Sequence, residues 1–194
     1  MSALLRQFRP AIVAVVALTV LCGIVYPMLV TGVAQLGWGG RADGDLVERD
    51  GVVVGAALIG QPFVSPQYFH PRPSAAGDGY DGAASSGSNL GPSNEEYLAE
   101  VTTRVETYRQ ANGLAADAVV PVDAVTASAS GLDPHISVRN ARLQAARVAA
   151  ERGLALDQVL AAIDDHTTSR PLAVLGDPGV EVLQLNLALD TMTP

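Results

Sequence analysis

The first pattern along the chain is an apolar stretch, residues 11–36, which begins at Ala11, ends at Leu36 and contains no charged residue. As a helix rising ~1.5 Å per residue, its 26 positions span about 39 Å, more than the roughly 30 Å hydrocarbon core of a bilayer. The stretch therefore predicts one transmembrane helix. Within it, Pro27 lacks a backbone donor and predicts a kink. Gly23 belongs to a small-xxx-small pair that lets a neighbouring helix approach closely.

Two other interpretations of this stretch stay open, a cleaved signal peptide and a lipid anchor. Small residues at positions 32–34 offer a cleavage site, but the apolar run is longer than the usual core of a signal peptide. Cys22 is the only cysteine, and Leu21 precedes it where a lipid-attachment site has a small residue. We therefore favour a permanent membrane anchor.

The charges that flank the span predict its orientation. Arg6 and Arg9 precede it with no acidic residue near them, whereas charges of both signs follow it. By the positive-inside rule, the N-terminus stays in the cytoplasm. The sequence thus predicts a single-pass protein of the cell membrane, inner or plasma. Its parts are the cytoplasmic residues 1–10, the membrane helix, a linker over 37–44 and an extracytoplasmic domain over 45–194.

Beyond the span, the hydrophobic pattern alternates between the periods of strands and helices. Asp50-Gly51 between two apolar runs predicts a β-hairpin. Residues 61–94 are rich in Pro, Gly and Ser but carry four aromatic residues, which favours a long ordered loop. A capping box that starts at Ser93 opens an amphipathic helix, and Gly113 closes it.

The rest of the pattern predicts, in order, a strand over 119–127, helices over 138–152 and 156–165, and a strand over 180–186. Ser137 is the expected N-cap of the first of these helices. The fold class is therefore α+β, with one N-terminal transmembrane helix followed by a single extracytoplasmic domain.

Composition narrows the classes of function. The 12 basic residues are all Arg, and 20 acidic residues bring the net charge to −8. An acidic exterior argues against nucleic acid as a partner, which needs a basic face. The absence of Lys excludes a phosphate-binding loop of the form GxxxxGK[ST], and with it a Walker-type ATPase.

The densest polar cluster lies over residues 128–137. Ser130, Asp133 and His135 are the residue types of a nucleophilic triad, but three of them within six positions leave little room for the required chain of hydrogen bonds. The chain also lacks the GxSxG elbow of such enzymes. We favour a structural role, in which Asp133 accepts backbone N–H bonds and Pro134 fixes a rigid turn.

Asp133 and His135 are also types that bind metals. Asp164, Asp165 or His166 could complete such a site. Only three histidines exist, no HExxH motif occurs, and short Asp/His motifs at a helix start are usually caps. We therefore predict no metal site and no catalytic residue.

Several motifs follow one another along the whole chain. They are Val25-Tyr26-Pro27, Ala57-Leu58-Ile59-Gly60-Gln61, Tyr68-Phe69, Arg72-Pro73-Ser74-Ala75, Gly87-Ser88-Asn89-Leu90, Ser93-Asn94, residues 125–137, Arg147-Val148-Ala149 and residues 183–190. With these motifs, the chain resembles the KdpC family, the C subunits of the Kdp potassium-transporting P-type ATPases. Glu181 stands where the family pattern has Asn, so no contact of that side chain is carried over.

The resemblance implies a non-catalytic accessory subunit of a high-affinity ATP-driven potassium importer. Its partners would be a P-type ATPase subunit, a pore-forming potassium-binding subunit and a small single-span subunit. ATP and potassium would be handled by the complex, with no cofactor bound directly by this chain. The family is described as a catalytic chaperone that raises the ATP affinity of the ATPase subunit, which conflicts with an extracytoplasmic domain. The alternative is a free-standing anchored binding module or hydrolase.

The motifs supply candidates for partner contacts or for structural roles. These are Tyr68, Phe69, Arg72, Ser88, Asn89, Asn94, Ser128, Ser130, Gly131, Leu132, Asp133, Pro134, His135, Ser137 and Asn186.

Overall fold

The computed structural model describes residues 2–170, 172 and 174–192. The chain divides into two compact units, and the division lies between Leu46 and Val47. The first unit is helical and the second combines helices with strands, so the predicted α+β class is confirmed.

The first unit is one continuous helical rod made of α1 (Ser2–Val20), a π-helical turn η1 (Leu21–Val25) and α2 (Tyr26–Ala42). Residues 6–42 form the one helix in the described part of the chain that is long and apolar enough to cross a membrane, and an 18-residue window within it has a mean hydropathy of 2.5. The π turn lies just before Pro27, which has no N–H to donate to the preceding turn. The expected distortion of the span therefore takes the form of a widened turn.

The end of this rod differs from the expected linker. Residues 37–42 continue the helix, although Trp38 leaves helical geometry, with φ −148° and ψ 50°. Glycines flank Trp38 on both sides and favour such a break, since glycine lowers helix propensity. Only residues 43–45 separate the helix from the next element.

The predicted hairpin, strands β1 (Leu46–Arg49) and β2 (Val52–Ala56), opens the second unit, except that its first residue, Leu46, is the last of the first unit. Asp50 and Gly51 both have positive φ, 53° and 76°, as a type I′ turn requires. The loop that follows runs without helix or strand as far as Asn94. This confirms the hairpin and the long connection.

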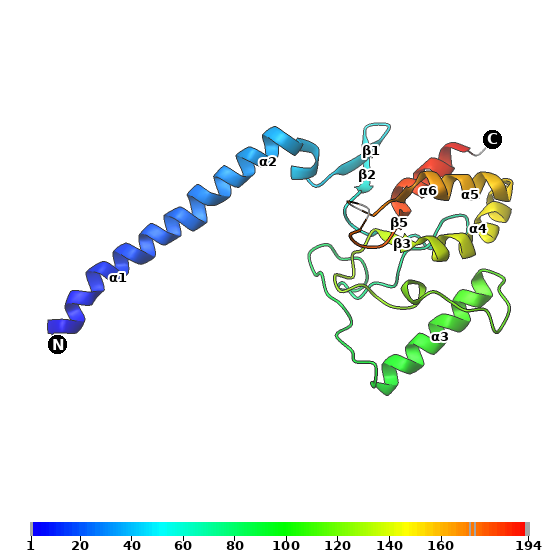
Figure 1. The fold of residues 1–194 in the computed structure, drawn as a ribbon, viewed down its shortest axis with the longest axis horizontal. Helices are drawn as coiled ribbons and strands as arrows, with labels where there is room; N and C mark the ends of the chain where they lie inside the picture. Colours follow the sequence, from blue (N-terminus) through cyan, green and yellow to red (C-terminus); the bar gives the residue numbers. More distant parts are fainter. Residues whose placement is uncertain (1, 171, 173, 193–194) are drawn as a thin grey trace. The chain divides into compact units, whose positions relative to one another are not determined.

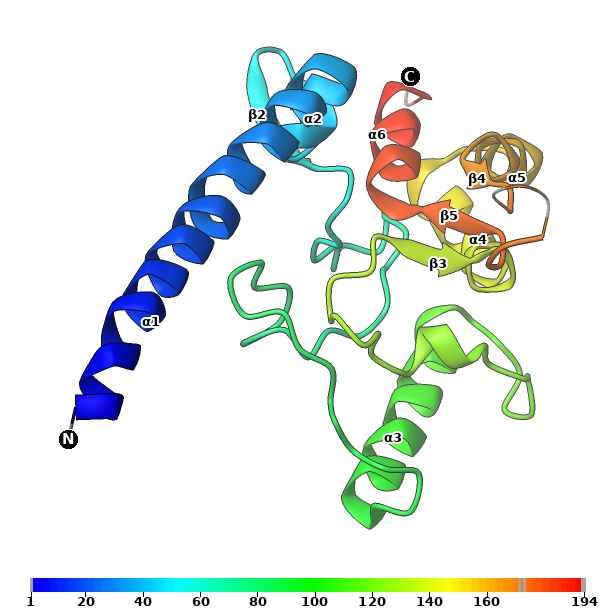
Figure 2. The ribbon, with the colours of Figure 1, turned by 60° about the vertical axis from the view of Figure 1, so that its left-hand side comes forward.

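The core lies around a three-stranded antiparallel sheet in the order β3-β5-β4, formed by β3 (His135–Ser137), β5 (Gly179–Glu181) and β4 (Thr167–Thr168). Figure 2 shows helix α4 lying against β3 and β5. The helices beside this sheet are α4 (Val138–Arg152), α5 (Leu156–Asp165) and α6 (Val182–Met192). Their buried side chains include Ala145, Val148, Val159, Ile163, Leu185 and Leu189, which pack with Ile136 and Val180 of the sheet.

Helix α3 (Glu95–Ala111) lies apart from the cluster of α4, α5 and α6 (Figure 1). Its N-cap is Asn94, whose side chain accepts a hydrogen bond from the Tyr97 N–H, so the predicted cap at Ser93 is wrong by one position. Ser137 caps α4, as the sequence predicts, and the left-handed Gly153 ends the helix after its predicted last residue, Arg152. The predicted bounds of α5 are also confirmed.

Two predicted strands are wrong. Residues 119–127 form an irregular segment with one 3-10 turn, η2 (Val122–Ala124), because the Asp123 side chain holds the start of α4 in place of a strand ladder. Residues 180–186 contain only the end of β5, and α6 starts at Val182. The alternation of apolar and polar residues over 180–186 predicted a strand. A helix that is covered on most of its surface can bury the same apolar residues, so the pattern did not distinguish the two.

Candidate functional site

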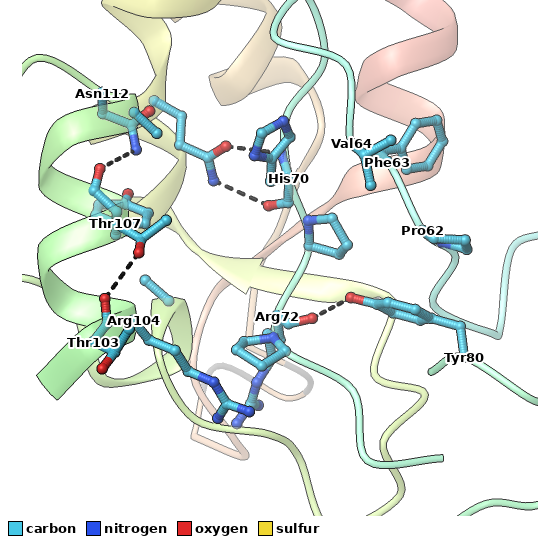
Figure 3. Close-up of a pocket in the computed structure, with 16 residues that line it drawn as sticks. Pro62, Phe63, Val64, His70, Arg72, Tyr80, Thr103, Arg104, Thr107 and Asn112 are labelled. Atoms are coloured by element: carbon cyan, nitrogen blue, oxygen red, sulfur yellow. Dashed lines mark hydrogen bonds between the residues drawn. The ribbon is translucent and has the colours of Figure 1, made fainter. Parts of the chain in front are cut away.

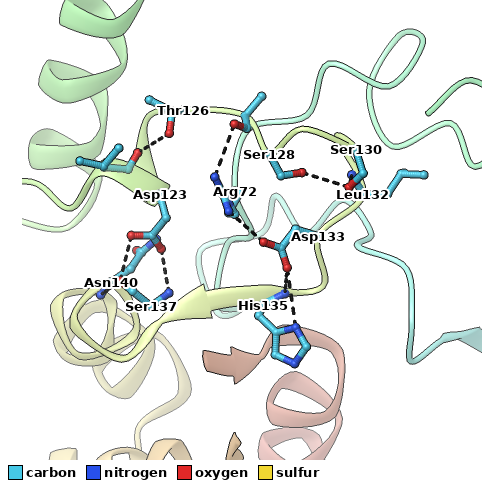
Figure 4. Close-up of polar contacts among 12 residues, drawn as sticks. Arg72, Asp123, Thr126, Ser128, Ser130, Leu132, Asp133, His135, Ser137 and Asn140 are labelled. Atoms are coloured by element: carbon cyan, nitrogen blue, oxygen red, sulfur yellow. Dashed lines mark hydrogen bonds and ion pairs between the residues drawn. The ribbon is translucent and has the colours of Figure 1, made fainter. Parts of the chain in front are cut away.

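The predicted polar cluster, residues 128–137, leads into β3 (Figure 4). We call it the structural node, because its hydrogen bonds join several segments of the chain. One oxygen of the Asp133 carboxylate accepts the backbone N–H of His135 at 3.0 Å, and the other accepts the Arg72 guanidinium at 2.8 Å. Pro134 lies between Asp133 and His135 in the chain, and its carbonyl accepts the N–H of Val182 at 3.1 Å. The turn thus joins the long loop, β3 and the start of α6.

The same contacts set the charges of the node. Burial disfavours the charged form of Asp133, but the hydrogen bonds from His135 and Arg72 outweigh it and lower its pKa from 3.8 to about 2. The interaction with Asp133 raises the pKa of His135, against the opposing effect of burial. The His135 Nδ1 lies 3.6 Å from the Asp133 carboxylate, close enough for an ion pair when the ring is protonated.

The first half of the cluster clasps the long loop through backbone groups. The Ser130 carbonyl accepts the N–H of Ser86 at 3.0 Å, and the Gly131 carbonyl accepts the Ser74 hydroxyl at 2.7 Å. Gly131 has φ +67°, and a Cβ there would lie 2.5 Å from the Ser86 carbonyl oxygen. Only glycine therefore fits this crossing of two chain segments. The Leu132 carbonyl extends the clasp by accepting the Gly60 N–H at 2.8 Å.

Sequence reasoning missed Asp123, which locks the start of α4. Its carboxylate accepts the Ser137 hydroxyl, the Ser137 N–H and the Asn140 side-chain amide, at 2.8, 2.8 and 2.9 Å. Ser137 in turn accepts the Asn140 N–H at 3.1 Å as the helix cap. The only sequence signal was an acid inside a run otherwise typical of a strand, which argues against that strand.

Two buried amides hold the long loop as a neighbouring strand would. The side chain of Asn186 accepts the Phe69 N–H at 2.8 Å and donates to the Phe69 carbonyl at 3.0 Å. Gln144 does the same at His70, with distances of 2.8 and 3.0 Å. Because both amides are buried, these bonds satisfy groups that would otherwise be costly to bury. Asn186 was a candidate from the sequence, and Gln144 was not.

Arginines of α4 complete this anchoring. Arg147 donates to the Pro66 and Tyr68 carbonyls, and Arg152 donates to the Gln67 carbonyl at 2.7 Å. The Arg152 guanidinium also lies 4.9 Å from the centre of the Tyr68 ring, a cation–π arrangement. The loop therefore depends on α4 and α6 for its conformation.

The remaining candidates have separate places. Phe69 is fully buried in the core, so its role is structural and it offers no surface to a partner. Tyr68 is half-buried beside Phe63. Ser88 and Asn89 are exposed in the long loop, directly after Gly87, whose backbone lies against Ser128 and Ala129, and Asn94 caps α3.

The node lacks the hydrogen bonds of a catalytic triad. The Ser130 hydroxyl accepts the Leu132 N–H and lies 3.2 Å from the Ser128 hydroxyl, and within the described residues no hydrogen bond joins it to His135. The metal alternative does not assemble either. Asp164 pairs with Arg142 at 3.0 Å, and the described residues contain no group of three or more His, Cys, Asp or Glu placed to hold a metal.

The fold and the node define a class, a protein with one helix long and apolar enough to cross a membrane and an α+β domain that uses its densest polar cluster to order a long loop. Comparison with known proteins then shows the family. The profile described as "KdpC: K+-transporting ATPase, c chain" matches residues 8–191, and the chain belongs to this family.

Relatives match over nearly the whole chain. A protein of Mycobacterium tuberculosis is 60% identical over 187 residues, covering 96% of this chain and 99% of the relative. Proteins of Rhodospirillum rubrum and Caulobacter vibrioides are 50% and 51% identical over 191 and 193 residues. Both alignments cover 98% of this chain; they cover 98% of the Rhodospirillum rubrum protein and 96% of the Caulobacter vibrioides protein. All three bear the name "Potassium-transporting ATPase KdpC subunit".

Proposed function

We propose that this chain is the accessory C subunit of an ATP-driven potassium import complex. Its partners are the P-type ATPase subunit, the pore-forming potassium-binding subunit and a small single-span subunit. The observation that carries the proposal is the similarity to proteins named as such subunits, which extends from the apolar helix through the α+β domain.

The proposed topology places residues 1–10 in the cytoplasm and the α+β domain outside. Arg6 and Arg9 before the span support this orientation by the positive-inside rule. The domain then lies on the side from which potassium enters. It contacts extracytoplasmic parts of the partners, while the span packs among their helices.

The proposed role is assembly, without catalysis by this chain. Ser130, Asp133 and His135 support this, because their bonds order the loop and do not link them as a triad. ATP lies on the other side of the membrane from the domain in this topology. Any rise in the ATP affinity of the ATPase subunit, as the family resemblance implies, would therefore pass through the membrane helices.

The test is purification of the complex from a strain that lacks its own high-affinity potassium importer. The chain, tagged at its N-terminus, is produced with the three partner subunits and extracted in mild detergent. We expect the partners to co-purify and the cells to grow at limiting potassium only when this chain is present. A chain that elutes alone, together with growth in its absence, would favour the free-standing module.

A further inference from the structure

A half-open groove lies between the long loop and α3 (Figure 3). Its volume is about 460 Å³, within the range of small-molecule sites, which is roughly 300 to 1,000 Å³. One wall carries Pro62, Phe63 and Val64 of the loop, and the other carries Thr107 and Ala111 of α3. Neither the structural node nor the proposed assembly role accounts for this groove.

The walls of the groove are mainly apolar and are held in place. Val64 is 85% exposed, an unusual state for a large aliphatic side chain in an ordered loop. The Gln144 amide fixes the backbone of His70 at the floor, and the Tyr80 hydroxyl donates to the Arg72 carbonyl. Burial raises the pKa of Tyr80 to about 12, so this donor keeps its proton at neutral pH. The groove is thus preformed, as ligand sites usually are.

One region of the groove is cationic. Arg72 and Arg104 line it, and they donate to the carbonyls of Ala127 and Val125, two residues apart on one segment. No carboxylate is among the described lining residues, although acidic residues outnumber basic ones in the whole chain. Burial and the charge of Arg147 lower the pKa of His70, which leaves the two guanidinium groups as the cations.

The two arginines keep unused donors. Each pairs with one carboxylate outside the groove, Arg72 with Asp133 at 2.8 Å and Arg104 with Glu100 at 2.6 Å. A guanidinium has five N–H donors, and the buried Nε of Arg72 has no acceptor in the described structure. The Arg72 and Arg104 side chains are 23% and 29% exposed, so both stay accessible to an anionic group in the groove.

We propose that this groove binds an amphiphile with an acidic head, with an apolar chain along the walls at Phe63, Val64 and Ala111 and the head at Arg72 and Arg104. A carboxylate or phosphate matches the fork of guanidinium donors, and the apolar chain covers side chains that are now exposed to water. The proposal is independent of the assembly role.

The probe is dodecanoate carrying a diazirine, and the uncharged control compound is dodecanol carrying the same diazirine. The full chain is reconstituted in nanodiscs of phosphatidylcholine, labelled by light and mapped by mass spectrometry. We expect the acid to label residues 62–73 and 103–112, with at least about tenfold higher apparent affinity than the alcohol, as for loss of a charge-assisted hydrogen bond. Equal affinities, or labelling confined to the membrane helix, would overturn the proposal.

Two exposed threonines of α3 provide matched variants. Thr107 lines the groove and Thr102 does not, and each hydroxyl donates to the carbonyl four residues earlier, at 2.9 and 2.8 Å. Thr107→Phe should fill the groove and reduce labelling of the loop at least about tenfold, whereas Thr102→Phe should leave it unchanged. Equal labelling in both variants contradicts the site. Arg104→Gln should reduce the difference in apparent affinity between the acid and the alcohol. An unchanged difference in affinity contradicts the assigned position of the head.

A second labelling experiment distinguishes the two possible sources of the amphiphile, the bilayer and the solution. Nanodiscs of phosphatidylglycerol replace those of phosphatidylcholine under the same probe. Suppressed labelling of the loop identifies the anionic lipid of the bilayer as the occupant, and undiminished labelling identifies a free amphiphile. Both results support the groove as a site for an acidic amphiphile.

Discussion

Arg152 and Arg49 reach the same carboxylate from different environments. Both pair with Asp190, at 2.9 and 3.1 Å, but the Arg152 side chain is 3% exposed and that of Arg49 is 44% exposed. Removing one partner of a buried ion pair leaves polar groups without compensation, whereas an exposed pair contributes little. The two residues therefore form a natural comparison.

Arg152→Met should destabilise the α+β domain by about 2–3 kcal/mol, because the Gln67 carbonyl and Asp190 lose a buried donor. Arg49→Gln should cost less than about 1 kcal/mol. Urea unfolding of the full chain in nanodiscs, read by pulse proteolysis of the domain, measures both. Equal losses would show that burial of Arg152 does not decide its contribution.

The pair of Asp133 and His135 predicts a pH dependence. The pKa of His135 is raised on folding, so its contribution is complete below the ordinary value of 6.5 and is lost as pH rises through the folded value. The pKa of Asp133 falls to about 2, so its contribution is present above 3.8 and is lost as pH falls towards 2. The pair should therefore stabilise the domain most between about pH 4 and 6.5.

His135→Gln should reduce stability in that window and change it little above about pH 8, where the ring of the parent is neutral. Pulse proteolysis of parent and variant across pH tests this. His166 gives a matched control, because its ring bonds the Ala162 carbonyl at 2.8 Å and not a carboxylate. A His166→Gln variant with the same pH profile as His135→Gln would contradict the assignment.

At the scale of elements, two left-handed glycines separate backbone strain from crowding. Gly131 and Gly153 have nearly equal φ, 67° and 66°. A Cβ at Gly131 would lie 2.7 Å from the backbone nitrogen of Ala76, whereas nothing lies within 4 Å of a Cβ at Gly153.

Gly153→Ala should therefore cost about 1–2 kcal/mol, the strain of the left-handed region alone. Gly131→Ala should cost more, about 3 kcal/mol or above, and should release the clasp between the node and the long loop. Hydrogen exchange at Ser86, whose N–H donates to the Ser130 carbonyl, reports that release directly. Unchanged protection of Ser86 in Gly131→Ala would show that the loop is held by other contacts.

At the scale of the whole molecule, the proposed orientation is tested with single cysteines. The only natural cysteine, Cys22, lies within the span, so a Cys22→Ser background removes it. Ser85→Cys places an exposed thiol on the domain, and Gln7→Cys places one before the span. A membrane-impermeant maleimide should label Ser85→Cys in spheroplasts and Gln7→Cys only after lysis. The reverse pattern would place the domain in the cytoplasm.

The sequence by itself determined the features that depend on local order. Residues 11–36 contain no charged residue and are mostly apolar, Asp50-Gly51 permits the left-handed turn, and Ser137 and Gly153 bound α4 through groups close to them in the chain. Each signal lies within a few residues of its effect. Periodicity, caps and turn chemistry therefore sufficed for the α+β class and for three helices of the domain, except for the exact N-cap of α3.

Only the tertiary structure decided how the long loop is held and where α6 begins. Gln144 and Asn186 hydrogen-bond to backbone 74 and 117 residues away, and no local pattern indicates those partners. Asp123 replaces a predicted strand with a lock on α4 that forms only when both segments meet. The apolar run at 180–186 fits a strand or a mostly buried helix equally well, and packing on α5 and β5 selects the helix. Long-range hydrogen bonds and burial are properties of the folded arrangement, so no local pattern in the sequence contains them.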